Sequence, residues 1–214
     1  MTKIIATIGD SLTSGDLFYN SNLKNGLGGN YQGYLKNKLN KKWTNLDFQI
    51  ENYGIPGQTT DQIYSRLSSI IHSDIVILMM GTNDCWLFGN GNQEYHSELV
   101  ADIVQKFVDS IHFLYSANPL IELFIFSIPP VGRSSGMLGM KSIIQNVNMK
   151  IEKLCNNAKS VYYINLFPYL ADLQGDLKPE YHVGDDVHFT DEAYKIIGDT
   201  VGEEIIKNSI NKGI

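Results

Sequence analysis

The sequence has little of what disulfide-stabilised, metal-binding or nucleic-acid-binding proteins are rich in. Its 214 residues include only 2 cysteines, Cys85 and Cys155, and no Cys-x-x-C pair, so neither a disulfide framework nor a zinc or redox motif is indicated. Lys and Arg number 17 against 23 Asp and Glu, which gives a formal net charge of −6. Because a phosphate backbone requires a basic surface, we expect no nucleic-acid partner.

Long apolar runs are also absent. The longest, Ile75–Met80, has the length of a strand and falls far short of the roughly 18 residues that cross a bilayer. The N-terminal residues lack the long apolar stretch and small-residue cleavage site of a signal peptide. We therefore expect a cytoplasmic protein without a membrane span.

What the sequence does contain is an alternation of short apolar runs and longer amphipathic stretches. The runs with the composition of buried strands are Lys3–Ile8, Asp47–Asn52, Asp74–Met80, Ile121–Ile128 and Val161–Ile164. The stretches with helical periodicity are Tyr31–Leu39, Gln62–Ile71, Leu99–Leu114, Met140–Leu154 and the segment from Thr190 to Ile205. Strands separated by helices predict a mainly parallel five-stranded sheet with helices on both faces, in a single domain spanning residues 1–214.

In such a sheet the ligand lies beyond the carboxyl ends of the strands, so the segments after the strands are the places to look for chemistry. Gly9, Asp10 and Ser11 follow the first strand directly. This position places a serine hydroxyl at the sheet edge, where it could act as a nucleophile. Taken alone, Ser11 could equally be an ordinary helix N-cap.

Two further segments offer hydrogen-bond donors at the same edge. Gly57 precedes a predicted helix, so its N–H could point into a cleft, and Asn83 carries a side-chain amide just after the third strand. Either donor could stabilise a negative charge that develops on a carbonyl oxygen. The alternative for both is turn chemistry without a ligand.

Near the end of the chain, Asp185 stands three residues before His188. A carboxylate at this spacing can bond one imidazole nitrogen and leave the other free to accept a proton. The other histidines have no such partner in the sequence, and His182 stays without a role. A divalent metal site within residues 182–188 is a rival interpretation, although no H-E-x-x-H motif accompanies it.

Taken together and in this order, the four motifs resemble those of the GDSL, or SGNH, hydrolase family. The similar segments are Gly9-Asp10-Ser11-Leu12, Gly57, Gly81-Thr82-Asn83-Asp84 and Asp185-x-x-His188. Two departures stand out: Asp186 where many members have glycine, and Phe189 where proline is frequent. The resemblance implies a flavodoxin-like three-layer α/β/α fold and esterase or lipase activity.

The residues and the resemblance together predict a serine ester hydrolase that forms an acyl-enzyme. Ser11 is the expected nucleophile, His188 the base and Asp185 its orienting carboxylate, while Ser11, Gly57 and Asn83 form the expected oxyanion hole. Asp10 is expected to point away from the nucleophile and to support the site by hydrogen bonding. No metal or organic cofactor is required.

The expected substrate is a small-molecule or glycan ester, with short acyl or acetyl groups favoured because no large apolar lid segment is evident. Trp86 and Phe88 are the expected substrate-binding residues, although plain packing roles would suit them equally. The alternatives are a carbohydrate O-acetyl esterase or acyltransferase, a lysophospholipase-like lipase and, least favoured, a non-catalytic binding protein. A homo-oligomer is compatible with the sequence.

Overall fold

A computed structural model describes residues 2–15, 30–88, 95–134 and 138–209 of the chain. Its strands are β1 (Thr2–Gly9), β2 (Asp47–Gly54), β3 (Ile75–Met79), β4 (Glu122–Phe126) and β5 (Val161–Ile164). Its helices are α1 (Ser11–Ser14), α2 (Tyr31–Lys42), α3 (Thr60–Tyr64), α4 (Thr82–Phe88), α5 (His96–Ala117), α6 (Leu138–Asn156), α7 (Phe167–Leu170) and α8 (Asp191–Ser209), with the 3-10 helices η1 (Leu67–Ile70) and η4 (Pro179–Tyr181).

The five strands form one sheet in the order β2-β1-β3-β4-β5, and every neighbouring pair is parallel. The chain passes from β1 outward to β2 and then returns to the other side of β1 with β3. The order therefore reverses between β1 and β3, which is where open parallel sheets bind their ligands. This arrangement confirms the predicted parallel sheet.

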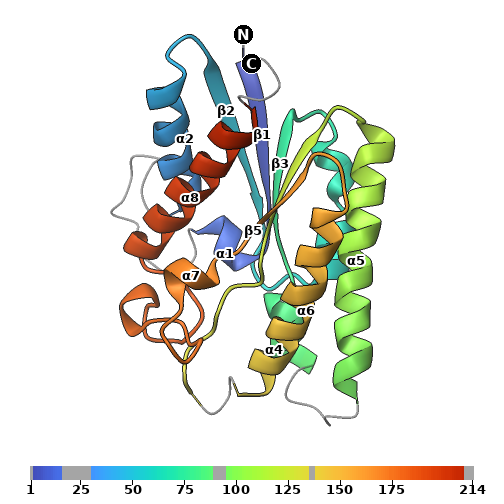
Figure 1. The fold of residues 1–214 in the computed structure, drawn as a ribbon, viewed down its shortest axis with the longest axis vertical. Helices are drawn as coiled ribbons and strands as arrows, with labels where there is room; N and C mark the ends of the chain where they lie inside the picture. Colours follow the sequence, from blue (N-terminus) through green and yellow to red (C-terminus); the bar gives the residue numbers. More distant parts are fainter. Residues whose placement is uncertain (1, 16–29, 89–94, 135–137, 210–214) are drawn as a thin grey trace.

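Helices cover both faces of the sheet, with α2 and α8 on one side and α5 and α6 on the other (Figure 1). Successive residues of β3 supply the two layers in turn, because side chains alternate along a strand. Val76 and Leu78 pack in the layer that includes α5 and α6, whereas Ile75 and Ile77 pack in the layer that includes α2 and α8. The predicted three-layer α/β/α architecture is thus confirmed.

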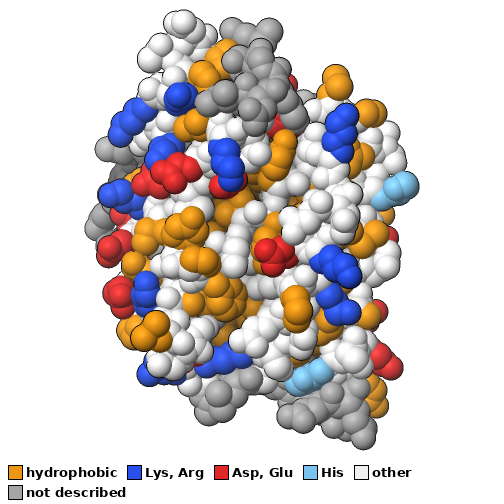
Figure 2. All heavy atoms as spheres, viewed as in Figure 1, with side chains coloured by type: hydrophobic (Ala, Val, Ile, Leu, Met, Phe, Trp, Pro, Cys, Tyr) orange, Lys and Arg blue, Asp and Glu red, His pale blue; other side chains and the backbone are white. Residues whose placement is uncertain are grey.

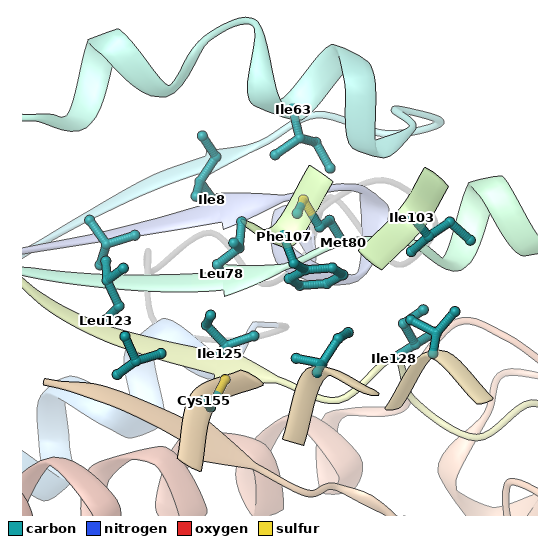
Figure 3. Packing of buried hydrophobic residues seen from close by; sticks show 14 of the residues in the cluster. Ile8, Ile63, Leu78, Met80, Ile103, Phe107, Leu123, Ile125, Ile128 and Cys155 are labelled. Carbon is teal, nitrogen blue, oxygen red and sulfur yellow. The ribbon is translucent and has the colours of Figure 1, made fainter. Parts of the chain in front are cut away.

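The layer beneath α5 and α6 is continuous and fully apolar at its centre. Figure 3 shows Phe107 of α5 close to Leu78 of β3 and Ile125 of β4 in this layer. All three are at most 2% exposed. Burial of this kind contributes about 1.5–3 kcal/mol per large apolar side chain, so this layer anchors the strand ends on which the site is built.

The turn from β1 into α1 is packed too tightly for a side chain. A Cβ atom on Gly9 would collide with the Met79 carbonyl oxygen and the Thr13 side chain, and one on Gly54 would collide with the Ser14 backbone. The two glycines let α1 sit directly against the ends of β2 and β3. Ser11, the first residue of α1, is thereby fixed at the sheet edge.

The prediction of one continuous helix over Gln62–Ile71 is wrong. The segment forms α3 and then, after a break at Arg66 (φ −116°, ψ 13°), the 3-10 helix η1. Ser65 and Ser69 hydroxyls donate to nearby main-chain carbonyls, at Gln62 and Arg66 respectively. Such local side-chain bonds compete with helix propagation, and periodicity does not reveal them.

On the face drawn in Figure 2, Lys and Arg side chains lie interspersed with Asp and Glu, and hydrophobic side chains gather along the middle. Within the described ranges, no helix combines the length and the apolar composition that a bilayer crossing would need.

Candidate active site

The residues that follow β1 and β3 meet the segment that precedes α8 in one cleft at the carboxyl edge of the sheet. The cleft measures about 310 Å³. Its lining residues are Ser11, Thr82, Asn83, Trp86, Asp185, Val187 and His188. Five of the seven belong to the motifs singled out in the sequence, although up to 177 positions separate them along the chain.

The cleft brings a hydroxyl, an imidazole and a carboxylate into one line. Ser11 Oγ lies 3.0 Å from His188 Nε2, and His188 Nδ1 lies 2.6 Å from Asp185 Oδ2. Because an ionised carboxylate can only accept, Nδ1 carries the ring proton and Nε2 is left to accept from the serine. This is the arrangement in which a serine hydroxyl can be deprotonated as it attacks.

Local hydrogen bonds keep Asp185 ionised. Partial burial alone would raise the pKa of this carboxyl, but the N–H groups of His188 and Val187, which donate to Oδ1, and the imidazole outweigh that effect and hold the pKa below its usual range. The carboxylate therefore stays charged at any pH at which His188 could act as a base.

The two departures from the family pattern have structural explanations. Asp186 does not compete for His188, because its carboxylate accepts from the Ser134 N–H at 3.1 Å and faces His182 Nε2 at 3.5 Å. Its backbone is left-handed, with φ at 67°, which accounts for glycine being common at this position. Phe189 is 4% exposed and packs edge-to-face on Tyr194.

Asn83 lies beside Ser11 and has both of its amide N–H groups directed at named acceptors. One donates to the Gln58 carbonyl at 3.0 Å, and the other reaches Asp10 Oδ2 at 3.4 Å. The second bond is long, so a stronger acceptor in the cleft, such as an oxyanion, can draw that N–H away. Asn83 is thus anchored on one side and available on the other.

Asp10 is fully buried and lies next to the Asn83 amide and the first turn of α1. Its Oδ1 accepts from the Leu12 N–H at 2.9 Å, which caps α1. Burial raises the pKa of Asp10 to about 7, against the lowering effect of the Leu12 bond. The expectation that Asp10 acts by hydrogen bonding agrees with these contacts.

Gly57 is not among the described residues that line the cleft. It is exposed and left-handed, with φ at 75°, and it precedes Gln58, whose carbonyl holds Asn83. Its contribution to an oxyanion hole therefore stays a prediction.

Arg66 is a residue that the sequence analysis missed. Its half-buried guanidinium donates to the Gly9 carbonyl at 3.0 Å, the Tyr53 carbonyl at 2.7 Å and Gln58 Oε1 at 2.6 Å. It thereby ties the end of β1 to the end of β2 and to the loop that holds Asn83. No sequence signal could have found it, because two of its three partners are main-chain carbonyls, which every residue has.

Asp84 completes the framework at the other end of that loop. It accepts from the Thr60 N–H at 3.0 Å and from the Thr60 hydroxyl at 2.7 Å, and so caps α3 from a different strand end. Burial raises the pKa of Asp84, although the Thr60 bonds oppose the shift. Asp84 therefore has a structural role in the motif, because its carboxylate holds α3 against α4.

Of the two predicted substrate-binding residues, Trp86 lines the cleft and is 45% exposed. The side chain of Phe88 lies outside the described part of the structure. Thr82 and Val187 line the cleft as well, although the sequence analysis gave neither residue a role.

Within the described residues, no three His, Cys, Asp or Glu side chains are placed so that they could hold a metal ion. The rival interpretation of residues 182–188 as a metal site is therefore not supported by that part of the chain. Two other histidines, for which the sequence showed no carboxylate three residues earlier, have carboxylate neighbours in the fold. His72 faces Glu51 at 2.9 Å, and His182 faces Asp186.

The protein-family model described as the GDSL-like Lipase/Acylhydrolase family matches residues 7–196, which include every motif named above. No curated protein matches the chain.

Several solved structures share the fold. An acetyl xylan esterase from Geobacillus stearothermophilus superposes with a TM-score of 0.72 at 19% identity, covering 95% of this chain and 94% of that one. A lipase/acylhydrolase from Enterococcus faecalis gives 0.71 at 21% identity, with 96% of each chain covered. A carbohydrate esterase family 3 protein from Talaromyces cellulolyticus gives 0.69 at 16% identity, covering 96% and 97%.

Proposed function

Because the chain belongs to the GDSL-like lipase/acylhydrolase family, a family of ester hydrolases, we propose that it cleaves short-chain acyl or acetyl esters through an acyl-enzyme on Ser11. The observation that carries the proposal is the 3.0 Å contact between Ser11 Oγ and His188 Nε2, with Asp185 on the far side of the ring. Hydroxyl, imidazole and carboxylate in this order form a nucleophile, a base and an orienting group.

In the first half-reaction, Ser11 Oγ attacks the ester carbonyl carbon while its proton passes to His188 Nε2. Charge develops on the carbonyl oxygen, which accepts from the Asn83 amide and from the Ser11 N–H. The Ser11 N–H has no partner within α1, because the first N–H groups of a helix never do. The alcohol then leaves and takes the proton from His188.

In the second half-reaction, a water molecule takes the place of the alcohol. His188 accepts a proton from the water, whose oxygen attacks the acyl carbon, and the donors that served the first oxyanion serve the second. Collapse returns the proton to Ser11 and releases the carboxylic acid. Asp185 stays ionised throughout and stabilises the imidazolium cation in both steps.

The size of the cleft supports small acyl groups. Its volume of about 310 Å³ lies at the lower end of the range for ligand pockets, roughly 300–1,000 Å³, and must hold part of the alcohol as well as the acyl group. A carbohydrate O-acetyl ester is the second candidate, because half-exposed Trp86 offers a flat apolar face suited to a sugar ring. The acetyl xylan esterase that shares the fold supports this candidate.

The test is a hydrolysis series with acetyl, butyryl, octanoyl and palmitoyl esters of one chromogenic alcohol, run with a chelator present. We expect kcat/KM to be highest for acetyl or butyryl and to fall with chain length, and we expect Ser11→Ala to be inactive on all four. A maximum at palmitoyl would instead support a lysophospholipase-like lipase. Added sugar alcohols separate hydrolysis from acyl transfer by the products formed.

A further inference from the structure

Residues 182–188 contain two pairs of histidine and aspartate, and the proposed mechanism uses only one of them. The pair of Asp185 and His188 faces Ser11. The pair of His182 and Asp186 lies behind it, with His182 Nε2 at 3.5 Å from Asp186 Oδ1. The side chain of His182 is only 11% exposed, so its ring is held in the loop rather than displayed to solvent.

The contacts of His182 fix its protonation pattern. Its Nδ1 accepts two backbone N–H groups, from Gly184 at 3.2 Å and from Asp186 at 3.0 Å. A nitrogen that accepts carries no proton, so the ring proton of His182 resides on Nε2, on the side of the Asp186 carboxylate. The ring therefore accepts from the backbone through Nδ1, and its proton-bearing Nε2 faces the Asp186 carboxylate.

The two residues that donate to His182 are also the two that are left-handed in this loop. Gly184 has φ at 102° and Asp186 has φ at 67°. Asp185, the residue between them, carries the carboxylate that orients His188. A left-handed backbone at a residue other than glycine persists only where its surroundings enforce it, and the His182 ring is one of the groups that enforce it.

A neighbouring loop holds Asp186 from the other side. The Gly132 N–H donates to the Asp186 carbonyl at 2.8 Å, and the Ser134 N–H donates to its carboxylate at 3.1 Å. A Cβ atom on Gly132 would collide with the Asp186 side chain. Asp186 is thus clamped between His182 and residues 132–134, and the backbone of Asp185 follows from that clamp.

We propose that His182 is a positioning residue for the reaction: by accepting two N–H groups on Nδ1, it holds the left-handed turn that presents Asp185 to His188. The inference rests on the proposed function, since it concerns the base of the same triad. It assigns His182 no contact with substrate. It also explains how the chain tolerates Asp186 at a position that favours glycine.

Three substitutions at His182 separate an acceptor role from mere packing. In His182→Asn, the side-chain oxygen lies where Nδ1 was and can accept the same two N–H groups. In His182→Gln, the amide lies near the former Nε2 and cannot reach them, and in His182→Ala there is no acceptor. The matched control is His72→Ala, which removes another histidine–carboxylate pair in the loop before β3, at the opposite end of the strands.

With acetyl and butyryl esters, we expect His182→Ala and His182→Gln to lower kcat about 10–100-fold, because small displacements of a catalytic group cost that much, with KM changed less than about twofold. His182→Asn should restore kcat to within about threefold of the wild type, and His72→Ala should match the wild type. In NMR spectra, the downfield proton shared by His188 and Asp185 should broaden in the alanine and glutamine variants and stay sharp in the asparagine variant. The nitrogen shifts of His182 should report a proton on Nε2.

Equal kcat in the alanine, glutamine and wild-type proteins, or a proton on Nδ1 of His182, overturns the inference while Ser11→Ala stays inactive. Full activity of Ser11→Ala overturns the proposed function instead, whatever the His182 variants do. Equal loss in all three His182 variants would show that ring packing and not the acceptor is what counts, which also contradicts the proposal.

Discussion

The two halves of the candidate site are held in different ways. On the nucleophile side, Asp10 and Thr13 are fully buried around Ser11, and the turn is closed by glycines that touch the ends of neighbouring strands. On the base side, the Asp185 and His188 side chains are 43% and 25% exposed. The first half is positioned by the core of the protein, whereas the second is positioned by hydrogen bonds within residues 182–188 and by bonds from the neighbouring residues 132–134.

The difference has a consequence for what each residue can contribute. A side chain that is held in place by the core cannot be substituted without an effect on folding, because buried polar atoms left without partners are costly. A side chain that is held in place by a loop can be removed with little effect on folding, since solvent replaces its contacts. Substitutions on the two sides should therefore separate activity from stability, and the four below are ordered by the size of the expected effect.

The largest effect should come from the exposed half. His188→Ala removes the base, and we expect kcat for ester hydrolysis to fall about 10⁴-fold or more. The free energy of unfolding should change by less than about 1 kcal/mol, because Asp185 keeps its two backbone donors and is partly solvated. Kinetics and urea denaturation of the same preparation check both parts, and a loss of several kcal/mol in stability would contradict the loop-held picture.

The next effect concerns the buried half and depends on pH. Burial raises the pKa of Asp10 to about 7 from 3.8, so between these values the folded protein binds a proton that the unfolded chain has lost. The contribution of Asp10 to the free energy of unfolding of the wild type is therefore fully present below about pH 4 and is lost as the pH rises through 7. Asp10→Asn lacks this dependence.

The difference in unfolding free energy between Asp10→Asn and the wild type should shift in favour of the variant as the pH rises from 4 to 8, by up to about 4 kcal/mol. Urea denaturation across that range measures it. A difference that stays constant with pH would show that the Asp10 carboxyl is not kept protonated by burial.

Asn83→Ala tests the junction of the two halves. Loss of one oxyanion donor should lower kcat about 100-fold or more, with KM little changed. The Gln58 carbonyl also loses its donor, so stability should fall by about 1 kcal/mol. Asn83→Asp is the matched control, since it has the same shape with one oxygen in place of the amide nitrogen, cannot donate when ionised, and should be no more active than Asn83→Ala. A kcat within threefold of the wild type would remove Asn83 from the mechanism.

Arg66→Lys should have the smallest effect. A lysine ammonium cannot span the three acceptors that the guanidinium reaches, so the loop that holds Asn83 should loosen. We expect kcat to fall about 10-fold and stability to fall by about 1–2 kcal/mol. Unchanged kcat together with reduced stability would confine Arg66 to a structural role.

The same contrast explains how far the sequence could predict this structure. Strand and helix positions follow from the spacing of apolar residues, which is why β3, with Ile75–Met79, and the long helices lie where periodicity predicts them. Ser11 and Asn83 come together because the ends of β1 and β3 share one edge of the sheet, and the segment before α8 adds Asp185 and His188. The boundaries differ by a few residues, and the short helices α4 and α7 were not predicted.

What could not be predicted depends on side chains that bond the main chain. Arg66 and His182 bond main-chain carbonyl and N–H groups, which nearly all residues carry, so nothing in the sequence marks their partners. The break between α3 and η1 has the same cause, since serine hydroxyls compete with helical hydrogen bonds there. The predicted role of Phe88 in substrate binding stays a prediction, because its side chain lies outside the described part of the structure.

The most direct test of the account is covalent labelling with a serine-directed phosphonate ester, followed by mass spectrometry of the digested protein. The account predicts one stoichiometric adduct on Ser11, blocked by prior incubation with substrate and formed much more slowly in His188→Ala. An adduct on another serine, or labelling that proceeds equally well without His188, would contradict it.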